Sequence, residues 1–289
     1  MVTFTKLTGH IGAEVNDVDL NAPLTDATAQ AIYDGLMEHQ MLVFRDAHIT
    51  PEAQTALAAS LGPIMPVHPF YRSVDGHPPI AIIEDTAESK PENAEWHSDM
   101  SAMKEPPFGC ILHGRVIPPV GGDTLWCSMY AVHDALPEDL RAKLKDAYAV
   151  HDIRAGYDTR LDNGKDGDRA ETLENWGAEQ GNEVLHKLIM PHPATGRPLI
   201  YANVSYTLRI TGLEPDESRA VLKQIYELID KPDFQVRVKW RPGTVVMRDN
   251  FATQHYAVGD HFPAHRQMNR ITVARDRRAP YVAPEVVQQ

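Results

Sequence analysis

The chain has 289 residues, of which 43% are hydrophobic and 24% are charged, and 28 basic against 40 acidic side chains give a formal net charge of −12. This composition is typical of a globular protein, and the acidic balance argues against nucleic acid and anionic membranes as partners, because both are bound through basic surfaces. No run approaches the roughly 18 apolar residues of a membrane span, and the N-terminus does not resemble a signal peptide, so we expect a cytoplasmic protein.

The first elements predicted are two helices with a strand between them. Residues 26–38 place apolar side chains at helical spacing, and Thr25 precedes them as an N-cap. The apolar run 41–44 is typical of a buried strand. A second helix is predicted from Thr50, with proline at its first position, to Gly62 as its C-terminal end.

Short strands dominate the rest of the chain. They are predicted over residues 80–83, 109–117, 148–153, 185–190, 199–204, 234–240, 244–247 and 270–274. Residues 194–197 are typical of a hairpin turn, and residues 215–229 predict one late helix with an apolar stripe. Many strands with a few early and late helices indicate an antiparallel β-sandwich or barrel with helices packed outside.

No repeat or linker divides the chain, so we expect a single domain over residues 1–289. Two polar segments, around 84–95 and 156–182, are long insertions of the kind that form either lids or surface loops. Cys110 and Cys127 lie in apolar surroundings, which favours buried free thiols over a disulfide.

A histidine and a carboxylate stand two residues apart in Trp96-His97-Ser98-Asp99, so an extended backbone would put His97 and Asp99 on one face. A distant His255 is followed by Arg266 and Arg270. Two histidines and one carboxylate are the ligands of the facial triad of non-haem iron oxygenases. Such a triad leaves positions for a chelating 2-oxoacid and for dioxygen, and an arginine suits the distal carboxylate of the 2-oxoacid.

The chain resembles the Fe(II)/2-oxoglutarate-dependent dioxygenases of the TauD/TfdA family, and within it the taurine dioxygenases. The resemblance covers nearly the whole sequence. It is carried by Phe44-Arg45-Asp46, Trp96-His97-Ser98-Asp99, Gly121-Gly122-Asp123-Thr124-Leu125-Trp126, Phe234-Gln235-Val236-Arg237 and Ala252-Thr253-Gln254-His255-Tyr256-Ala257. The resemblance implies a mainly β fold with flanking helices around a double-stranded β-helix, the cupin-like jelly roll.

The family's iron and cosubstrate residues match positions in this chain. The resemblance implies that His97, Asp99 and His255 bind Fe(II), and that Thr124 and Arg266 bind the distal carboxylate of 2-oxoglutarate. Dioxygen is the second cosubstrate that it implies.

The resemblance also implies a substrate pocket. Its residues would be His68, Tyr71, Asn93, Arg270, Tyr157 and Tyr206. Tyr157 and Tyr206 stand where taurine dioxygenases have phenylalanine, and each adds a hydroxyl that needs a partner if it is buried.

The activity implied is hydroxylation of a small sulfonate, taurine or a close relative, at the carbon that bears sulfur. The products would be sulfite and an aldehyde, together with succinate and carbon dioxide, and a homo-oligomer is common in the family. Three alternatives stay open: the same chemistry on an alkyl sulfate or an aryloxyalkanoate, a zinc hydrolase with the same ligands, and a non-catalytic metal- or anion-binding protein.

Overall fold

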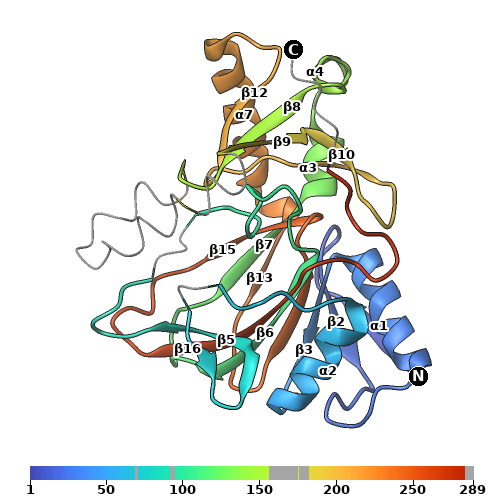
Figure 1. The fold of residues 1–289 in the computed structure, drawn as a ribbon, viewed down its shortest axis with the longest axis vertical. Helices are drawn as coiled ribbons and strands as arrows, with labels where there is room; N and C mark the ends of the chain where they lie inside the picture. Colours follow the sequence, from blue (N-terminus) through green and yellow to red (C-terminus); the bar gives the residue numbers. More distant parts are fainter. Residues whose placement is uncertain (69–70, 92–94, 156–174, 176–181, 284–289) are drawn as a thin grey trace.

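An eight-stranded sheet faces a three-stranded sheet in the computed structural model, which describes residues 1–68, 71–91, 95–155, 175 and 182–283 (Figure 1). The strands of the large sheet, in spatial order, are β1 (Thr3–Lys6), β2 (Ala13–Asn16), β3 (Met41–Phe44), β14 (Val245–Asp249), β6 (Gly109–Val116), β16 (Arg266–Val273), β5 (His77–Asp85) and β4 (Ser73–Val74). The small sheet has the order β13 (Gln235–Val238), β7 (Thr124–Ser128) and β15 (Thr253–Ala257). The prediction of a mainly β protein is confirmed.

Apolar side chains from both sheets fill the space between them. Trp126 and Val236 of the small sheet belong to one buried cluster with Val43, Leu112 and Met268 of the large sheet. Because alternate residues of a strand point to opposite faces, the same strands can also present polar side chains where the sheets separate.

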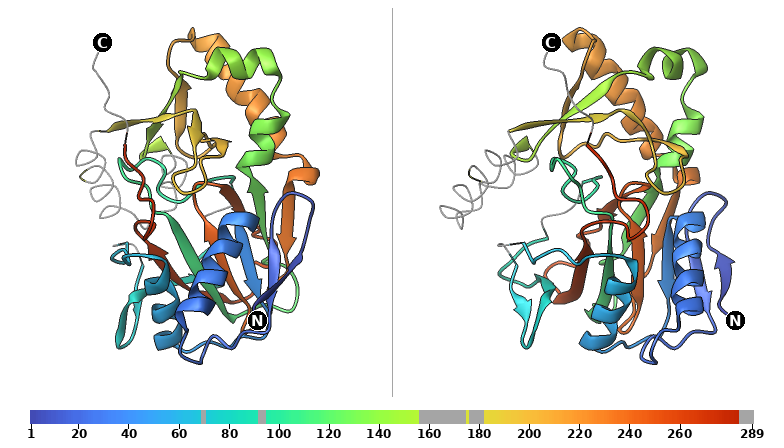
Figure 2. Two further views of the ribbon diagram at one scale, coloured as in Figure 1. Left: turned by 90° about the vertical axis from the view of Figure 1, so that its right-hand side faces the viewer. Right: turned by 45° about the vertical axis from the view of Figure 1, so that its right-hand side comes forward.

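Two N-terminal helices cover the other face of the large sheet (Figures 1 and 2). The side chain of Thr25 caps α1 (Asp26–His39), and that of Thr50 caps α2 (Pro51–Leu61) by accepting from Ala53 N at 3.1 Å. Both predicted helices are confirmed within one or two residues, because capping and periodicity are local properties of the sequence.

A second group of elements lies beyond one end of the two sheets, at the top of Figure 1. It consists of β8 (Tyr148–Asp152), β9 (Glu183–Lys187), β12 (Thr207–Ile210), the hairpin β10 (Ile189–Pro191) and β11 (Pro198–Ile200), and the helices α3 (Met129–Ala135), α4 (Glu138–Leu144) and α7 (Pro215–Ile229). The late helix predicted over 215–229 is therefore confirmed, whereas α3 and α4 were not predicted.

Two of the strand predictions in this group were wrong in extent. The single strand predicted over 185–190 is two strands, because the chain leaves β8 at Leu188 and then pairs with β11. The strand predicted over 199–204 ends at Ile200. The hairpin turn at 194–197 is confirmed, and Gly196 there has a φ of 68°, which glycine adopts readily.

Two strands that line the later site are longer than predicted. β16 begins at Arg266 instead of at Arg270, and β5 runs on to Asp85 instead of ending at Ile83. The polar segment expected from residue 84 therefore begins inside a strand. Of the predicted insertion 156–182, only residues 175 and 182 are described, so its expected role as a lid lies outside the described residues.

Cys110 and Cys127 are buried free thiols, as predicted. Among the described residues, the helices are too short or too polar to cross a membrane.

Candidate active site

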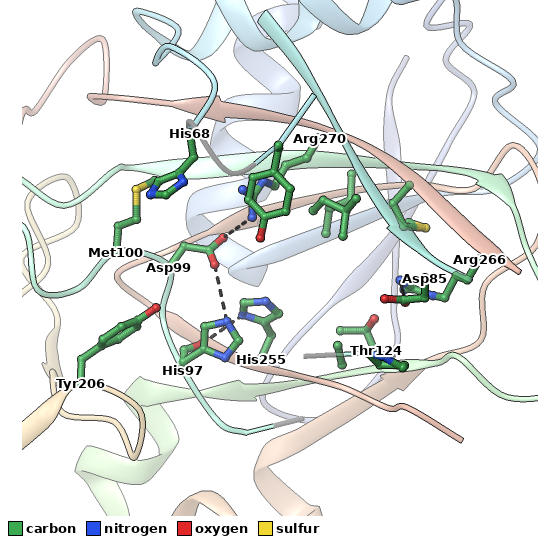
Figure 3. Close-up of a pocket in the computed structure, with 16 residues that line it drawn as sticks. His68, Asp85, His97, Asp99, Met100, Thr124, Tyr206, His255, Arg266 and Arg270 are labelled. Atoms are coloured by element: carbon green, nitrogen blue, oxygen red, sulfur yellow. Dashed lines mark hydrogen bonds and ion pairs between the residues drawn. The ribbon is translucent and has the colours of Figure 1, made fainter. Parts of the chain in front are cut away.

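A polar pocket opens between the two sheets and collects most of the predicted site residues (Figure 3). Its lining consists of His68, Tyr71, Ile83, Asp85, Pro91, His97, Asp99, Met100, Leu112, Thr124, Tyr206, His255, Ala257, Arg266, Met268 and Arg270. Every predicted site residue is among them except Asn93 and Tyr157, which lie outside the described residues.

Two histidines and a carboxylate converge at the centre of this pocket. His97 and His255 form an isolated antiparallel bridge, with His97 N donating to His255 O at 3.1 Å and His255 N donating to His97 O at 2.9 Å. Asp99 Oδ1 lies 3.6 Å from His97 Nε2. One potential ligand atom of each residue lies within 4.8 Å of the other two. The arrangement brings together groups that the chain separates by 255 − 97 = 158 residues.

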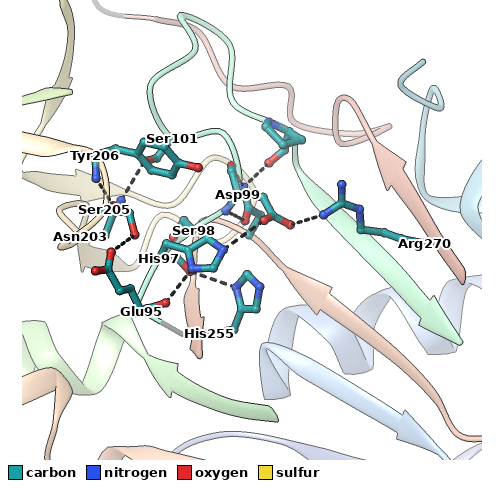
Figure 4. Close-up of polar contacts among 12 residues, drawn as sticks. Glu95, His97, Ser98, Asp99, Ser101, Asn203, Ser205, Tyr206, His255 and Arg270 are labelled. Carbon is teal, nitrogen blue, oxygen red and sulfur yellow. Dashed lines mark hydrogen bonds and ion pairs between the residues drawn. The ribbon is translucent and has the colours of Figure 1, made fainter. Parts of the chain in front are cut away.

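Backbone carbonyls fix the protonation of both imidazoles (Figure 4). His97 Nδ1 lies 2.8 Å from Glu95 O, and His255 Nδ1 lies 3.0 Å from His97 O. A carbonyl oxygen only accepts, so each Nδ1 carries a hydrogen, and in the neutral imidazole each Nε2 then offers its lone pair to a metal. Burial, with Arg248 beside it, lowers the pKa of His255 well below its ordinary value, which favours this neutral form.

Asp99 is ionised despite its burial. Burial acts to raise the pKa of this carboxyl, but the charges of Arg248 and Arg270 outweigh it and hold the pKa well below its usual range. Two neutral imidazole nitrogens and one carboxylate, with open space on one side, fit Fe(II) as three ligands of a facial triad.

One end of the pocket holds Arg266, Thr124 and Asp85. Arg266 is 7% exposed, and its Nε donates to Gly122 O at 3.1 Å. Gly122 has a φ of 71°, which glycine adopts more readily than other residues, and a Cβ at this position would lie only 3.1 Å from Arg266 Cδ. Both the backbone conformation and the close contact therefore favour glycine. Thr124 Oγ1 accepts from Trp240 Nε1 at 2.9 Å, which leaves the hydroxyl hydrogen of Thr124 to be donated to an anion.

Arg270 and its neighbours form another end of the pocket, where Arg270 Nη1 lies 3.7 Å from Asp99 Oδ2 (Figure 3). The Arg270 guanidinium lies over the Tyr71 ring, 4.9 Å from its centroid, and the His68 and Tyr71 rings are 6.2 Å apart. Met100 and Tyr206 complete this end.

The two arginines share one face of β16 because four residues separate them and strand side chains alternate. Four residues of a strand span about 13 Å. The pocket therefore offers two fixed cations, of which Arg270 lies beside Asp99 of the triad.

Sequence reasoning missed several polar residues of this site. Asp85 stands opposite Arg266 in the β5–β16 pairing, and Arg248 and Asn250 contact Asp99. His261 Nε2 lies 3.2 Å from Asp85 Oδ2. No spacing in the sequence brings these groups together, since the two partners of each contact lie far apart in the chain.

Comparisons with known proteins show which chains this one is similar to. A family model described as "Taurine catabolism dioxygenase TauD, TfdA family" matches residues 3–272. An alkylsulfatase of Acinetobacter baylyi is 33% identical over 271 residues, covering 93% of this chain and 84% of that protein. An α-ketoglutarate-dependent sulfate ester dioxygenase of Pseudomonas putida is 32% identical over 267 residues, covering 92% and 87%.

A crystal structure of a taurine dioxygenase from Burkholderia xenovorans superposes with a TM-score of 0.80 at 30% identity, covering 99% of this chain and 95% of that one. This likeness confirms the jelly-roll fold that the sequence predicts.

Proposed function

Because the chain belongs to the TauD/TfdA family of dioxygenases, we propose that it hydroxylates a small organic sulfonate, taurine or a close relative, at the carbon that bears sulfur. Membership of the family confirms the predicted enzyme class, a dioxygenase that requires Fe(II), 2-oxoglutarate and dioxygen. One oxygen atom enters succinate, formed with carbon dioxide from 2-oxoglutarate. The other enters the substrate, whose hydroxylated carbon expels sulfite and becomes an aldehyde.

The observation that carries the proposal is the pair of cations on one strand. Arg266 and Arg270 lie about 13 Å apart along β16, on the same face, and both line the pocket that contains the triad. A dioxygenase that uses two anionic reactants at one metal needs such an arrangement, because each anion must be oriented separately.

In this proposal His97, Asp99 and His255 hold the iron, which supplies the activation of dioxygen when it is bound. Arg266 and Thr124 bind the distal carboxylate of 2-oxoglutarate. An arginine fork and a hydroxyl donor both suit a carboxylate, and burial strengthens their interaction with it.

The other end receives the substrate. Arg270, stacked on Tyr71, and His68 bind the anionic head and hold the adjacent carbon towards the metal. We also expect Asn93 and Tyr157 to contact the substrate, and Tyr206 closes this side of the pocket.

A specific observation favours a second candidate, an alkyl sulfate oxidised at the carbon that bears oxygen. Ile83, Leu112, Met100 and Met268 line the pocket, and their apolar surfaces suit an alkyl chain better than the ammonium group of taurine. The alkylsulfatase and the sulfate ester dioxygenase among the relatives agree with it. An aryloxyalkanoate remains a third possible substrate of the same chemistry, whereas the zinc hydrolase and the non-catalytic binding protein are without support.

One experiment tests these substrates together. The protein, purified without oxygen, is supplied with Fe(II), 2-oxoglutarate, oxygen and a panel of taurine, alkanesulfonates, alkyl sulfates of matched chain length and aryloxyacetates. We expect substrate-stimulated succinate with sulfite from a sulfonate. Release of sulfate instead would assign the enzyme to sulfate esters. If no compound stimulates succinate, the proposal is wrong.

A further inference from the structure

Arg248 is a buried cation beside the metal triad. It lies near the end of β14, and its side chain is 1% exposed. A charge removed from water to this extent is tolerated only when it is paired and hydrogen-bonded. Arg248 Nη2 donates to Asp99 Oδ2 at 2.5 Å, and Arg248 Nη1 donates to Asn250 Oδ1 at 2.8 Å.

The two oxygens of Asp99 face different partners. Oδ1 faces the triad, 3.6 Å from His97 Nε2. Oδ2 faces away from it, towards Arg248 Nη2 at 2.5 Å and Arg270 Nη1 at 3.7 Å. One oxygen is therefore directed at the metal position while the other is taken by a guanidinium.

The main chain of Asp99 is fixed as well. Asn250 Oδ1 accepts from Asp99 N at 2.8 Å, and Asn250 Nδ2 donates to Asp99 O at 2.9 Å. Because Asn250 also accepts from Arg248, one connected group holds the backbone and the carboxylate of the ligand together.

Asp249, which lies between Arg248 and Asn250 in the sequence, fixes the end of β14 through contacts on the opposite side of the strand. Asp249 Oδ1 accepts from Phe251 N at 2.9 Å and from Ala252 N at 3.0 Å. Asp249 Oδ2 lies 2.7 Å from His192 Nε2, and both side chains are buried. The guanidinium of Arg248 is thus presented by a backbone that is anchored on two sides.

We propose that Arg248 is a positioning residue that keeps Asp99 a one-oxygen ligand. An octahedral metal that binds the triad through three atoms keeps three positions, which the two chelating oxygens of 2-oxoglutarate and one further molecule fill. A carboxylate that bound through both oxygens would take the last of these positions. By occupying Oδ2, Arg248 preserves the position that dioxygen needs. The inference rests on the metal site of the proposed function but not on the identity of the substrate.

The test counts the exchangeable water on a bound metal. Wild-type protein and Arg248→Met are saturated with Mn(II) and then with 2-oxoglutarate, and the enhancement of water proton relaxation is measured. We expect the wild type to retain an enhancement after 2-oxoglutarate binds, because one position still holds water. In Arg248→Met we expect this enhancement to be lost, because both oxygens of Asp99 would then bind the metal and leave no position for water.

Arg209→Met is the matched control, because Arg209, like Arg248, binds a carboxylate, but on the surface, where two of its nitrogens donate to Glu183 at 2.7 Å each. We expect it to behave as the wild type. Equal enhancement in wild type and Arg248→Met, at full metal and 2-oxoglutarate occupancy, overturns the proposal.

A crystal structure of the wild-type Mn(II)–2-oxoglutarate complex needs no variant and decides the question if Arg248→Met does not fold. Binding through Oδ1 alone supports the proposal, and binding through both oxygens overturns it. Neither measurement uses a substrate or turnover, so each remains decisive if the proposed sulfonate activity proves wrong.

Discussion

Asp85 and Arg266 stand directly opposite each other in the pairing of β5 with β16, and Asp85 Oδ2 lies 3.9 Å from Arg266 Nη1. Burial lowers the pKa of Arg266, and the charge of Asp85 opposes that shift. The carboxylate therefore compensates a buried cation that the proposed function assigns to 2-oxoglutarate. It also places a negative charge beside the position of an incoming anion.

Replacing Asp85 by asparagine should tighten the binding of 2-oxoglutarate. The variant keeps the shape of the side chain but removes a repulsive charge, and the cosubstrate then supplies the compensating carboxylate. We expect the dissociation constant of 2-oxoglutarate to fall about three- to tenfold. Without the cosubstrate we expect the variant to melt at a lower temperature than the wild type. Titration of the Mn(II)-loaded protein measures the first effect, and weaker binding in the variant would contradict the repulsion described.

Each of the two arginines of β16 should affect the binding of a different reactant. Arg266→Ala should weaken 2-oxoglutarate binding about tenfold or more, because a charge-assisted pair contributes about 1.5–3 kcal/mol. Arg270→Ala should raise the KM of the organic substrate by a similar factor while leaving the dissociation constant of 2-oxoglutarate within about threefold.

Steady-state kinetics with each reactant varied in turn checks this prediction. Metal affinity is measured alongside, since Arg270 also lies 3.7 Å from Asp99. If both variants change the same kinetic parameter, the assignment of one arginine to each anion is wrong.

Metal binding should stabilise the fold through the triad. The three ligands join two segments of the chain, which also contact each other through the bridge between His97 and His255 and through the contacts of Asp99 with Arg248 and Asn250. At a metal concentration about 100 times its dissociation constant, the linkage contributes about 2.7 kcal/mol to the free energy of unfolding. We expect Mn(II) to raise the melting temperature of the wild type and a chelator to reverse it. Asp99→Ala should lose this response, and an unchanged response would exclude Asp99 as a ligand.

His186, a buried histidine that does not line the pocket, should make stability depend on pH. Burial lowers the pKa of His186 to about 4, while its Nδ1 lies 2.7 Å from Tyr281 Oη and its Nε2 lies 3.0 Å from Met103 O. The ordinary value is about 6.5, so the unfolded chain binds the proton first as the pH falls. The contribution of His186 to stability is therefore fully present above pH 6.5 and is lost progressively as the pH falls towards 4.

The contribution of His186 to the free energy of unfolding should decrease by about 2 kcal/mol between pH 7 and pH 5. Urea denaturation at both values measures it. His186→Gln should show a smaller pH dependence than the wild type by about this amount. His10→Gln, on the surface, is the control and should leave the dependence unchanged. Parallel pH profiles for the wild type and His186→Gln would contradict the prediction.

Local signals in the sequence were sufficient for the elements whose ends they define. Thr25 and Thr50 cap helices where predicted, and the apolar run 41–44 is a buried strand. The ends of β5 and β16 were predicted less well, because Asp85 and Arg266 are polar residues that stay in strand conformation through their partner strand.

The residues of the candidate site also differ in how well local signals in the sequence predict them. The spacing of His97 and Asp99 and the matched motif at His255 predict a metal site, and the structure brings these three residues together. Arg248 and Asp85 carry no local signal. Asp85 meets Arg266 through the pairing of β5 with β16, and Arg248 meets Asp99 through the tertiary fold, and a single sequence specifies neither contact.

The shared face of β16 has a consequence for selectivity. β16 pairs with β5 continuously from Arg266 to Arg270 and also pairs with β6 at Arg270, so the spacing between the two anions cannot adjust to the substrate. The proposed reaction then oxidises whichever carbon stands at a set distance from the anionic head, regardless of the length of the tail beyond that carbon. Lengthening the tail of a substrate should change how tightly it binds but leave the position of the hydroxylated carbon the same.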